Sequence, residues 1–314
     1  MNFMIKIVPF EMAGFRLDRA LAELFPEYSR SRLQTWIKSG RVLVNEEQLR
    51  PKVLLKGGEV IVLNAEAEVI TTMEAEELPL EIVFEDSEML IINKPAGLVV
   101  HPAAGNWSGT LQNGLLFYAP VLSTIPRSGI VHRIDKDTSG LLMIAKTLTA
   151  HAHLVNQLQS RTVKREYLAI TQGRMTSGGT VDEPLGRHPV NRKRQAIVAS
   201  GKVAITHFRV LERYRQHTLI AVKLETGRTH QIRVHMAHIH YPLLGDPVYG
   251  GRFRLPKNCG AELAIELQGF KRQALHAAKL GVIHPGTGEY CEWTAELPED
   301  MDKLTKALAT NDKM

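Results

Sequence analysis

Cysteine and long apolar segments are scarce in this sequence. Its 314 residues include two cysteines, Cys259 and Cys291, too few for the disulfide framework of a small secreted domain. No apolar run approaches the ~20 residues that a membrane span requires, and the opening MNFMIKIVPFEM is too short for a secretory signal. Hydrophobic residues make up 44% of the chain, enough for more than one domain. We therefore expect a cytoplasmic protein with no membrane association.

Basic residues are also scarce in one stretch, although the net charge is +6. Residues 65–93 carry nine acidic residues and no Lys or Arg, whereas residues 1–64 have a net charge of +3 and residues 94–314 of +12. Cationic surfaces gain affinity for polyanions by releasing condensed counterions. Two basic bodies that flank an acidic connector therefore indicate either a nucleic-acid partner or an ordinary solvated enzyme surface.

The N-terminal segment has the pattern of two short helices followed by strands. Apolar residues at helical spacing precede Pro26: Leu17, Ala20, Leu21 and Leu24. A second helix is expected to begin at Ser29 or Ser31 and to end before Gly40, with Leu33, Trp36 and Ile37 inward. RVLVN and GGEVIVL are then typical of short strands.

The same segment, FRLDRALAELFPEYSRSRLQTWIKSGRVLVNEEQL, resembles an S4 domain, a small RNA-binding module. The resemblance covers residues 13–64 and implies that the basic face of the helix pair follows an RNA backbone. The expected RNA contacts are Arg30, Arg32, Lys38 and Arg41. The alternative is that these cations only solvate the outer faces of ordinary helices.

After this unit, residues 65–78 are acidic, lack periodicity and are predicted to be a linker. Strands dominate residues 79–300: LEIVFED, MLIINKP, GIVHRI, LLMIAKT, YLAIT, AITHFRVLERY and HTLIAVKLE. One amphipathic helix is expected at about residues 148–160, with Leu148, Leu154, Val155 and Leu158 inward. The fold class predicted for this larger domain is α+β on a mostly antiparallel mixed sheet. The tail, residues 301–314, is expected to be weakly helical at most.

Charged residues are concentrated between two apolar strands in HRIDKDTSG, residues 132–140. These residues can form a polar turn that caps its own backbone groups. However, a half-buried carboxylate such as Asp135 stays ionised only beside a cation or several N–H donors, and such sites are functional candidates.

Two further segments carry candidate residues. Tyr167 lies where the basic turn RTVKRE enters an apolar strand, so its ring either joins the core or offers a flat face to a nucleotide base. In LETGRTHQIRVHMAHIHYPLLGDPVYGG, a loop is expected before a helix at about residues 231–238. Its arginines, Arg228 and Arg233, are candidates for a bidentate clamp on a carboxylate or phosphate.

The same segment contains His230, His235, His238 and His240, which raises the question of a metal site. A catalytic zinc site usually needs three ligands in a defined arrangement. No HExxH motif or cysteine pair is present, and Asp246 is the one nearby acid. We therefore predict that the protein binds no metal. The sequence also lacks P-loop and Rossmann glycine patterns.

Taken together, five segments resemble the RluA-type family of RNA pseudouridine synthases: IINKPAGLVVHPAAGN, GIVHRIDKDTSGLLMIAKT, KREYLA, ETGRTHQIRVHMAHIHYPLLGDPVYGG and RQALHA. They occur in the family's order, behind the S4-like segment. The resemblance implies the pseudouridine synthase fold and is strongest to the branch that modifies a stem-loop of large-subunit (23S) ribosomal RNA. Ile134 stands where leucine is usual, which is a conservative difference.

The resemblance implies a role for each matching residue. Asp135 corresponds to the family's essential aspartate, Tyr167 to the tyrosine that packs on the target ring, and Arg233 to the basic partner of the catalytic carboxylate. Arg133 corresponds to the arginine that enters the duplex where the target base has left, and His132 is expected to contact RNA beside it. Isomerisation exchanges no electrons, so no cofactor is expected. Asp135 either attacks the sugar carbon or removes a 2′ proton, and the sequence leaves both routes open.

The sequence is compatible with three functions. The first is a pseudouridine synthase that acts, as a monomer, on large-subunit rRNA or the pre-ribosomal large subunit, or on another structured RNA such as tRNA. The second is a non-catalytic RNA-binding or ribosome-assembly protein of the same fold. The third is a metal-dependent nucleic-acid hydrolase that uses the histidines.

Overall fold

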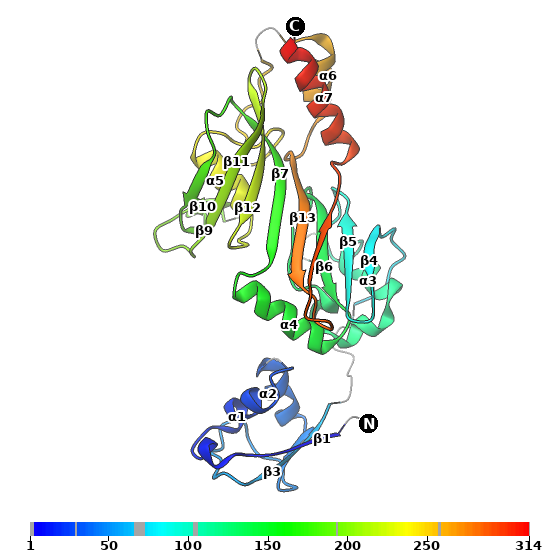
Figure 1. The fold of residues 1–314 in the computed structure, drawn as a ribbon, viewed down its shortest axis with the longest axis vertical. Coiled ribbons are helices and arrows are strands. Elements are labelled where there is room, and N and C mark those ends of the chain that lie inside the picture. The colour runs from blue at the N-terminus through cyan, green and yellow to red at the C-terminus, as the bar shows by residue number, and fades with distance from the viewer. Residues whose placement is uncertain are drawn as a thin grey trace.

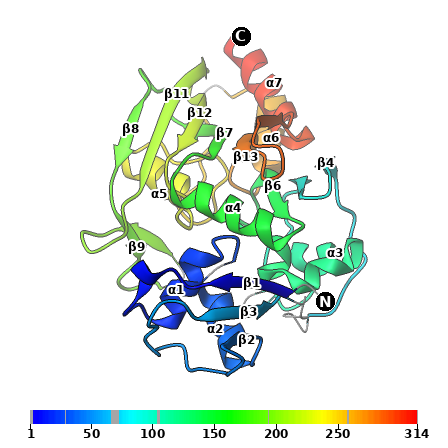
Figure 2. The ribbon, with the colours of Figure 1, turned by 60° about the horizontal axis from the view of Figure 1, so that its bottom comes forward.

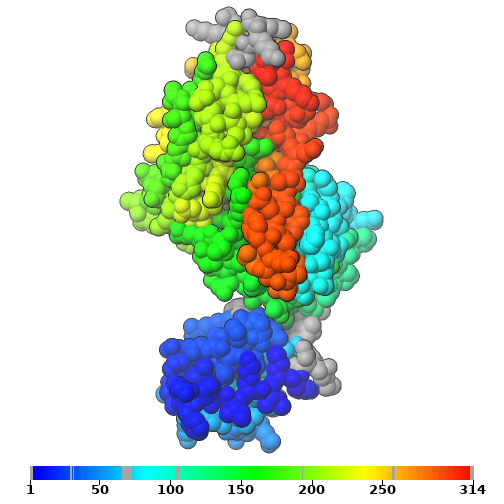
Figure 3. Space-filling model, in the orientation of Figure 1, coloured from blue at the N-terminus to red at the C-terminus, as the bar shows by residue number. Residues whose placement is uncertain are grey.

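The computed structural model describes residues 3–28, 30–65, 73–102, 106–192, 194–256 and 259–313. The chain forms two bodies, a small N-terminal domain and a larger one above it in Figure 1. The space-filling view shows the same division, with the N-terminal residues in blue (Figure 3). One hydrogen bond between the two bodies runs from Arg32 Nη1 to the carbonyl oxygen of Thr124, at 3.3 Å.

The small domain packs two helices on a short antiparallel sheet. Its elements are β1 (Phe3–Ile7), the 3₁₀ turn η1 (Phe10–Met12), α1 (Leu17–Leu24), α2 (Arg30–Lys38), β2 (Val42–Val44) and β3 (Val60–Asn64), with strand order β1-β3-β2. Its core contains Leu17, Leu21, Leu33, Trp36 and Ile37. Both helices were predicted from this apolar spacing and are confirmed; of the two candidate caps, Ser29 lies outside the described residues.

The S4-like segment was predicted from residue 13, and the folded N-terminal body extends ahead of it. β1 pairs with β3 from Phe3 to Ile7, so the domain includes the first strand as well. Three exposed apolar residues, Phe3, Ile5 and Ile7, alternate along β1 with half-buried Met4 and exposed Lys6. The strand therefore buries little of itself, and a pattern based on core residues does not detect it.

The larger domain is built on a mixed sheet. Its path is β4 (Ile82–Glu85), β5 (Met89–Lys94), β6 (Ser139–Ala145), β13 (Leu275–Ile283), β7 (Lys164–Gln172), β12 (His217–Leu224), β11 (Ile205–Arg213) and β8 (Gly179–Asp182), and β14 (Tyr290–Thr294) also pairs with β13. Among the described strands, β6 and β13 are the parallel pair and the remaining pairs are antiparallel. This confirms the predicted α+β class on a mostly antiparallel sheet. A separate ribbon joins β9 (Leu185–Arg187) to β10 (Gln195–Ile197).

Helices cover both faces of this sheet. On one face α4 (Leu148–Gln159) packs through Ala150 and Leu154 against Met89, Ile91 and Met143. On the other face, the apolar residues of α3 (Leu111–Tyr118) share one core cluster with Leu90 and Ile92 of β5, and α5 (Gln231–His238) joins this cluster beside β11. Figures 1 and 2 place α4 between the sheet and the small domain. Strand alternation thus buries both faces of β5, and the predicted helices at 148–160 and 231–238 are confirmed.

Two predictions for the larger domain are wrong. GIVHRI is not a strand. Its first residue, Gly129, is the last of the turn η3 (Pro126–Gly129), which follows η2 (Pro120–Thr124), and the segment makes one bridge, from Ile130 to Ile144. Arg127, Ser128 and Gly129 all have positive φ, which turns the chain away from an extended path.

The C-terminal tail is a helix, α7 (Glu299–Lys313), rather than the weakly helical segment predicted. Met301, Leu304, Ala307 and Leu308 are buried against Leu263 and Leu267 of α6 (Ala261–Gly269). Their spacing of three and four residues gives one apolar face, so the tail belongs to the larger domain.

Residues 65–78 were predicted to be an acidic linker, and of these, residues 66–72 lie outside the described residues. Of the part that is described, Glu76 is hydrogen-bonded to the larger domain through the backbone N–H of Gly109. In the described part of the chain, no helix combines the length and the apolarity needed to cross a membrane.

Candidate functional site

The loop from Ile130 to Thr138 holds Asp135 at the edge of the sheet. Ile130 and Ile134 are buried in the main core, whereas Arg133 between them is exposed. Lys94 is also buried, and its ammonium donates hydrogen bonds to the carbonyl oxygens of Pro95, Leu98 and Lys136 at 2.6, 2.9 and 2.8 Å. This lysine therefore ties the loop to the end of β5, and Lys136 contributes its carbonyl to that anchor.

The other end of the loop is fixed by a close approach of two strands. Gly140 has φ of +113°, and a Cβ there would lie 2.3 Å from the carbonyl oxygen of Ala277. Ser139 Oγ lies 2.9 Å from His276 Nδ1, and Gln273 donates to Thr138 Oγ1 at 3.0 Å. Thr138-Ser139-Gly140 thus joins the loop to β13 and to Gln273 just before it.

Asp135 forms an ion pair with Arg233, the third residue of α5. Arg233 Nη1 lies 3.0 Å from Asp135 Oδ2, and the same guanidinium donates through Nε and Nη2 to Asp246 at 2.7 and 2.9 Å. The side chains of Arg233 and Asp246 are 5% and 0% exposed, while that of Asp135 is 17% exposed. One guanidinium therefore bridges a buried carboxylate and a partly open one.

Electrostatics keep Arg233 and Asp246 charged. Burial opposes the charge of Arg233, but the hydrogen bonds and charge of Asp246, together with Asp135, outweigh it and raise the pKa of Arg233. Burial likewise opposes ionisation of Asp246, yet Arg233 and the backbone N–H groups of Tyr249 and Val248 lower its pKa. Arg233 thus stays protonated and presents a fixed cation to Asp135.

Two aromatic rings complete the surroundings of this ion pair. The Arg233 guanidinium lies 5.1 Å from the centroid of the Tyr249 ring, whose hydroxyl is 2.9 Å from His230 Nδ1. His230 Nε2 in turn lies 3.9 Å from Asp135 Oδ1. Burial lowers the pKa of His230, and the charge of Asp135 acts in the opposite direction.

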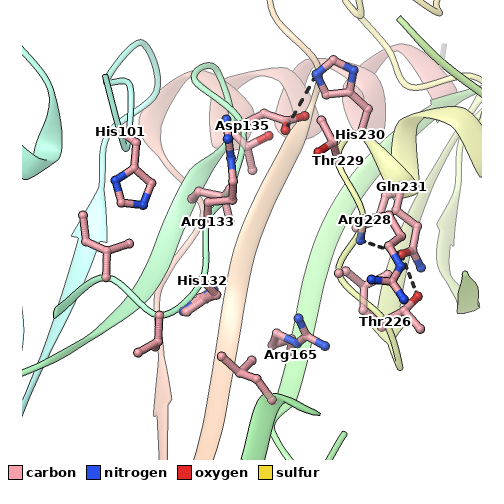
Figure 4. Close-up of a pocket in the computed structure, with 18 of the residues that line it drawn as sticks. His101, His132, Arg133, Asp135, Arg165, Thr226, Arg228, Thr229, His230 and Gln231 are labelled. Atoms are coloured by element: carbon pink, nitrogen blue, oxygen red, sulfur yellow. Dashed lines mark hydrogen bonds and ion pairs between the residues drawn. The ribbon is translucent and has the colours of Figure 1, made fainter. Parts of the chain in front are cut away.

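Asp135 opens into a cavity of about 960 Å³. Figure 4 shows Asp135 and Arg133 on one wall and His230, Thr229 and Arg228 on the wall opposite, with Arg165 on β7 between them. A polar cavity of this size is large enough for a nucleotide and its neighbouring backbone. The cavity thus brings together the predicted residues His132, Arg133, Asp135, Tyr167 and Arg233.

Tyr167 lies in the middle of the sheet and is 7% exposed. It pairs with Ala277 of β13 on one side and Val222 of β12 on the other, so its ring position is fixed by two neighbouring strands. Burial raises the pKa of its hydroxyl, with Asp135 acting in the same direction and Arg165 against it. Tyr167 is therefore a neutral phenol whose ring lines the cavity.

His132 is held in one tautomeric arrangement by the backbone. Its Nε2 lies 3.1 Å from the backbone N–H of Met143 and accepts that hydrogen bond. Burial, reinforced by the charge of Arg165, lowers the pKa of His132 to about 3. The ring is therefore neutral at physiological pH and carries its proton on Nδ1.

The four basic residues predicted on the small domain differ in exposure. Arg30 and Lys38 are exposed, although Arg30 also donates to Asp18 at 3.0 Å. Arg41 is half-buried and Arg32 is 9% exposed, with its guanidinium 4.9 Å from the Trp36 ring. Arg30 and Lys38 are thus open to a ligand, whereas Arg32 packs toward the larger domain.

Two of the four histidines near α5, His230 and His235, contact different partners. His235 lies 2.9 Å from Thr206 Oγ1 and 3.1 Å from the carbonyl oxygen of Glu183, whereas His230 contacts Tyr249. Within the described ranges, no group of three His, Cys, Asp or Glu side chains is arranged to hold a metal ion. Arg228 contacts no carboxylate there; its Nε donates to the carbonyl oxygen of Val203 at 3.1 Å.

Two residues of the site were not singled out in the sequence. Asp246 was noted only as an acid near the histidines, although its place before Pro247 in a glycine-rich turn is typical of a residue that caps backbone N–H groups. Arg165 is buried on the same face of β7 as Tyr167. A strand that points Tyr167 inward also points the residue two positions earlier inward, so alternation was the available signal.

Two family models match this chain. The family model described as RNA pseudouridylate synthase matches residues 88–238, and the S4 domain model matches residues 15–61. The first range contains Asp135, Tyr167 and Arg233, and the second contains α1 and α2.

Relatives match over nearly the whole chain. The protein named ribosomal large subunit pseudouridine synthase D from Pseudomonas aeruginosa is 58% identical over 96% of this chain and 94% of its own length. The protein of the same name from Escherichia coli strain K12 is 53% identical over 94% and 91%. The solved structure of human RNA pseudouridylate synthase domain containing 4 is 26% identical, with a TM-score of 0.56 over 73% of this chain and 93% of that one. With the folded site and these matches in agreement, the chain belongs to the RNA pseudouridylate synthase family.

Proposed function

We propose that this protein isomerises specific uridines to pseudouridine in large-subunit (23S) ribosomal RNA. The observation that carries the proposal is the Asp135–Arg233 pair, at 3.0 Å, in a basic cavity of about 960 Å³. The relatives at 58% and 53% identity are named for activity on the ribosomal large subunit, which supports this choice of RNA.

The reaction breaks the C1′–N1 bond of uridine, turns the base and forms a C1′–C5 bond. The proton on C5 is lost to solvent and N1 gains one, so atoms and charge balance without a redox step. Asp135 is the proposed catalytic carboxylate and either attacks C1′ or removes the 2′ proton. Arg233 holds the carboxylate in place, since its position is fixed by Asp246 behind it.

The target uridine must leave its base stack to reach Asp135, which requires about a few kcal/mol. Arg133 is exposed beside the cavity, and we propose that it occupies the space vacated in the RNA. Tyr167 then offers its ring to the flipped base, and His132 offers its Nδ1–H. These contacts recover part of the energy of unstacking.

We further propose that the small domain selects the RNA. Arg30 and Lys38, both exposed, and Arg41 would follow the RNA backbone, and Arg32 would contribute from its position beside Trp36. The substrate is the stem-loop RNA, free or within the pre-ribosomal large subunit, and we expect a monomeric enzyme in the cytoplasm.

Release of tritium from 5-tritiated uridine tests the proposal, because C5 loses its hydrogen only when the new bond forms. Purified protein is incubated with unmodified large-subunit rRNA, with small-subunit rRNA and with tRNA as matched controls. We expect release from the large-subunit RNA alone. Release from tRNA instead would reassign the substrate, and binding without release would indicate an RNA-binding assembly protein.

A further inference from the structure

Arg165 is a buried cation that the proposed reaction does not use. It lies on β7, two residues before Tyr167, and is 8% exposed. Its side chain lines the cavity, and Figure 4 shows the guanidinium directed across the cavity toward the segment that carries Thr226 and Arg228. A charge in this position can reach a bound ligand.

The described residues provide Arg165 with little compensation. Its Nη2 donates a long hydrogen bond, 3.4 Å, to the carbonyl oxygen of Glu225, and its buried Nε has no partner there. The Glu225 carboxylate is turned to other groups, Arg161 at 3.6 Å and His207 at 2.7 Å. Across the described part of the chain, no carboxylate lies within 4.0 Å of the Arg165 guanidinium.

A buried guanidinium without a counter-charge is unfavourable in the free protein. Removing a cation from water opposes folding unless an anion and hydrogen-bond acceptors replace the lost hydration. Arginine does not escape this by losing its proton, because its intrinsic pKa lies far above neutrality, even though burial lowers the pKa of Arg165. An anionic group that enters the cavity would supply what the protein lacks.

We propose that Arg165 binds a backbone phosphate of the RNA next to the target uridine. The inference rests on the proposed function, which identifies RNA as the ligand. A phosphodiester provides both a full negative charge and two acceptor oxygens, matching the planar fork of a guanidinium, whereas a uracil carbonyl provides no charge. Arg127 and Arg133 also line the cavity and add to its attraction for a polyanion.

Gly227, which has no side chain, leaves the space that the Arg165 guanidinium occupies. A Cβ built on Gly227 would lie 2.6 Å from Arg165 Nη1, so a larger residue would displace that end of the side chain. Gly227 is opposite Arg165 on the loop before α5 and is itself part of the cavity wall. Gly227→Ala therefore tests the position of the guanidinium without removing its charge.

The experiment combines variants of Arg165 with RNA in which one phosphate at a time is replaced by a neutral methylphosphonate. Affinity of a stem-loop that wild type modifies is measured at several salt concentrations. Arg165→Met is expected to weaken binding about tenfold or more and to lower the salt slope by about 0.7–0.9, the value for one phosphate contact. One methylphosphonate should weaken RNA binding by wild type but not weaken binding by Arg165→Met further.

The control for general loss of charge is Arg209→Met, because Arg209 is an exposed arginine on β11 outside the cavity lining.

The thermal midpoint of the free enzyme separates binding from a structural role. Arg165→Met should match or exceed wild type, since it removes an uncompensated buried charge, and Gly227→Ala should lose affinity while retaining the charge. The proposal would be overturned if Arg165→Met had a lower thermal midpoint than wild type and if every methylphosphonate weakened RNA binding by wild type and by Arg165→Met equally. If Arg165→Met does not fold, the same phosphate scan on Arg165→Lys tests the proposal. This variant keeps the positive charge but loses the planar fork of the guanidinium. Wild-type tritium release with no effect of Arg165 rejects only this inference, whereas no release by wild type rejects the proposed function.

Discussion

The buried ion pair between Arg233 and Asp246 makes a quantitative prediction about stability. Asp246→Asn keeps the shape of the side chain, but it removes the charge that faces Arg233 through bonds of 2.7 and 2.9 Å. Breaking one partner of a buried pair costs about 3–5 kcal/mol. Arg233 retains Asp135 as a second partner, so we expect the lower end, about 3 kcal/mol.

A matched control exists on the surface of the same domain. Arg272 makes an equally short bidentate pair with Asp300, at 2.7 and 2.7 Å, but the Asp300 side chain is 48% exposed. Exposed pairs contribute at most about 1 kcal/mol, because water already solvates the charges. Asp300→Asn should therefore destabilise the domain much less than Asp246→Asn.

Thermal unfolding followed by circular dichroism measures both variants. A loss of 3 kcal/mol in a domain of this size corresponds to a fall in Tm of about 6–12 °C. The account of the site would be refuted if Asp246→Asn and Asp300→Asn unfolded at the same temperature. That result would mean that the buried position of Asp246 adds nothing and that Arg233 does not depend on it.

Three further changes have defined outcomes. Gly140→Ala should abolish folding of the larger domain or lower its Tm sharply, because the added Cβ would lie 2.3 Å from the Ala277 carbonyl oxygen, and size-exclusion chromatography with circular dichroism checks this. Burial lowers the pKa of His132 to about 3, so between about pH 6.5 and 3 the unfolded chain binds a proton there that the folded chain does not. His132 therefore destabilises the fold as the pH falls through that window. Urea unfolding at pH 7.5 and 5 should show a smaller loss of unfolding free energy for His132→Asn than for wild type. Deletion of residues 1–70 should leave the larger domain folded but weaken or broaden RNA selection, and an unchanged map of modified uridines would contradict a guiding role for the small domain.

Local sequence patterns predicted the elements whose apolar residues follow one period. The helices α1, α2 and α4 were predicted because their apolar residues recur at helical spacing. The helix α5 was expected without such a period, since Ile232, Val234 and Met236 do not settle one. GIVHRI was wrong because three apolar residues suggested a strand, whereas the positive φ angles of Arg127, Ser128 and Gly129 depend on how the turn packs. The tail was wrong because its polar residues hid the apolar face of Met301, Leu304 and Leu308.

The site shows the same division between local and long-range information. Asp135 and Arg233 were selected by motif, but their 3.0 Å pairing joins residues 98 positions apart and depends on the loop anchor at Lys94. Arg165 was missed because it sits in the charged run Lys164-Arg165-Glu166, which suggests a solvated turn. Strand alternation from Tyr167 places Arg165 on the buried face, while Lys164 and Glu166 remain half-exposed.

The most direct test of the central claim is single-turnover tritium release by Asp135→Asn on large-subunit rRNA, with RNA affinity measured in the same samples. Asparagine is nearly isosteric and keeps an acceptor for Arg233, but it can neither attack C1′ nor remove a proton as a carboxylate does. We predict that release is abolished while RNA affinity stays within a few fold of wild type. Release at the wild-type rate would show that Asp135 is not the catalytic carboxylate.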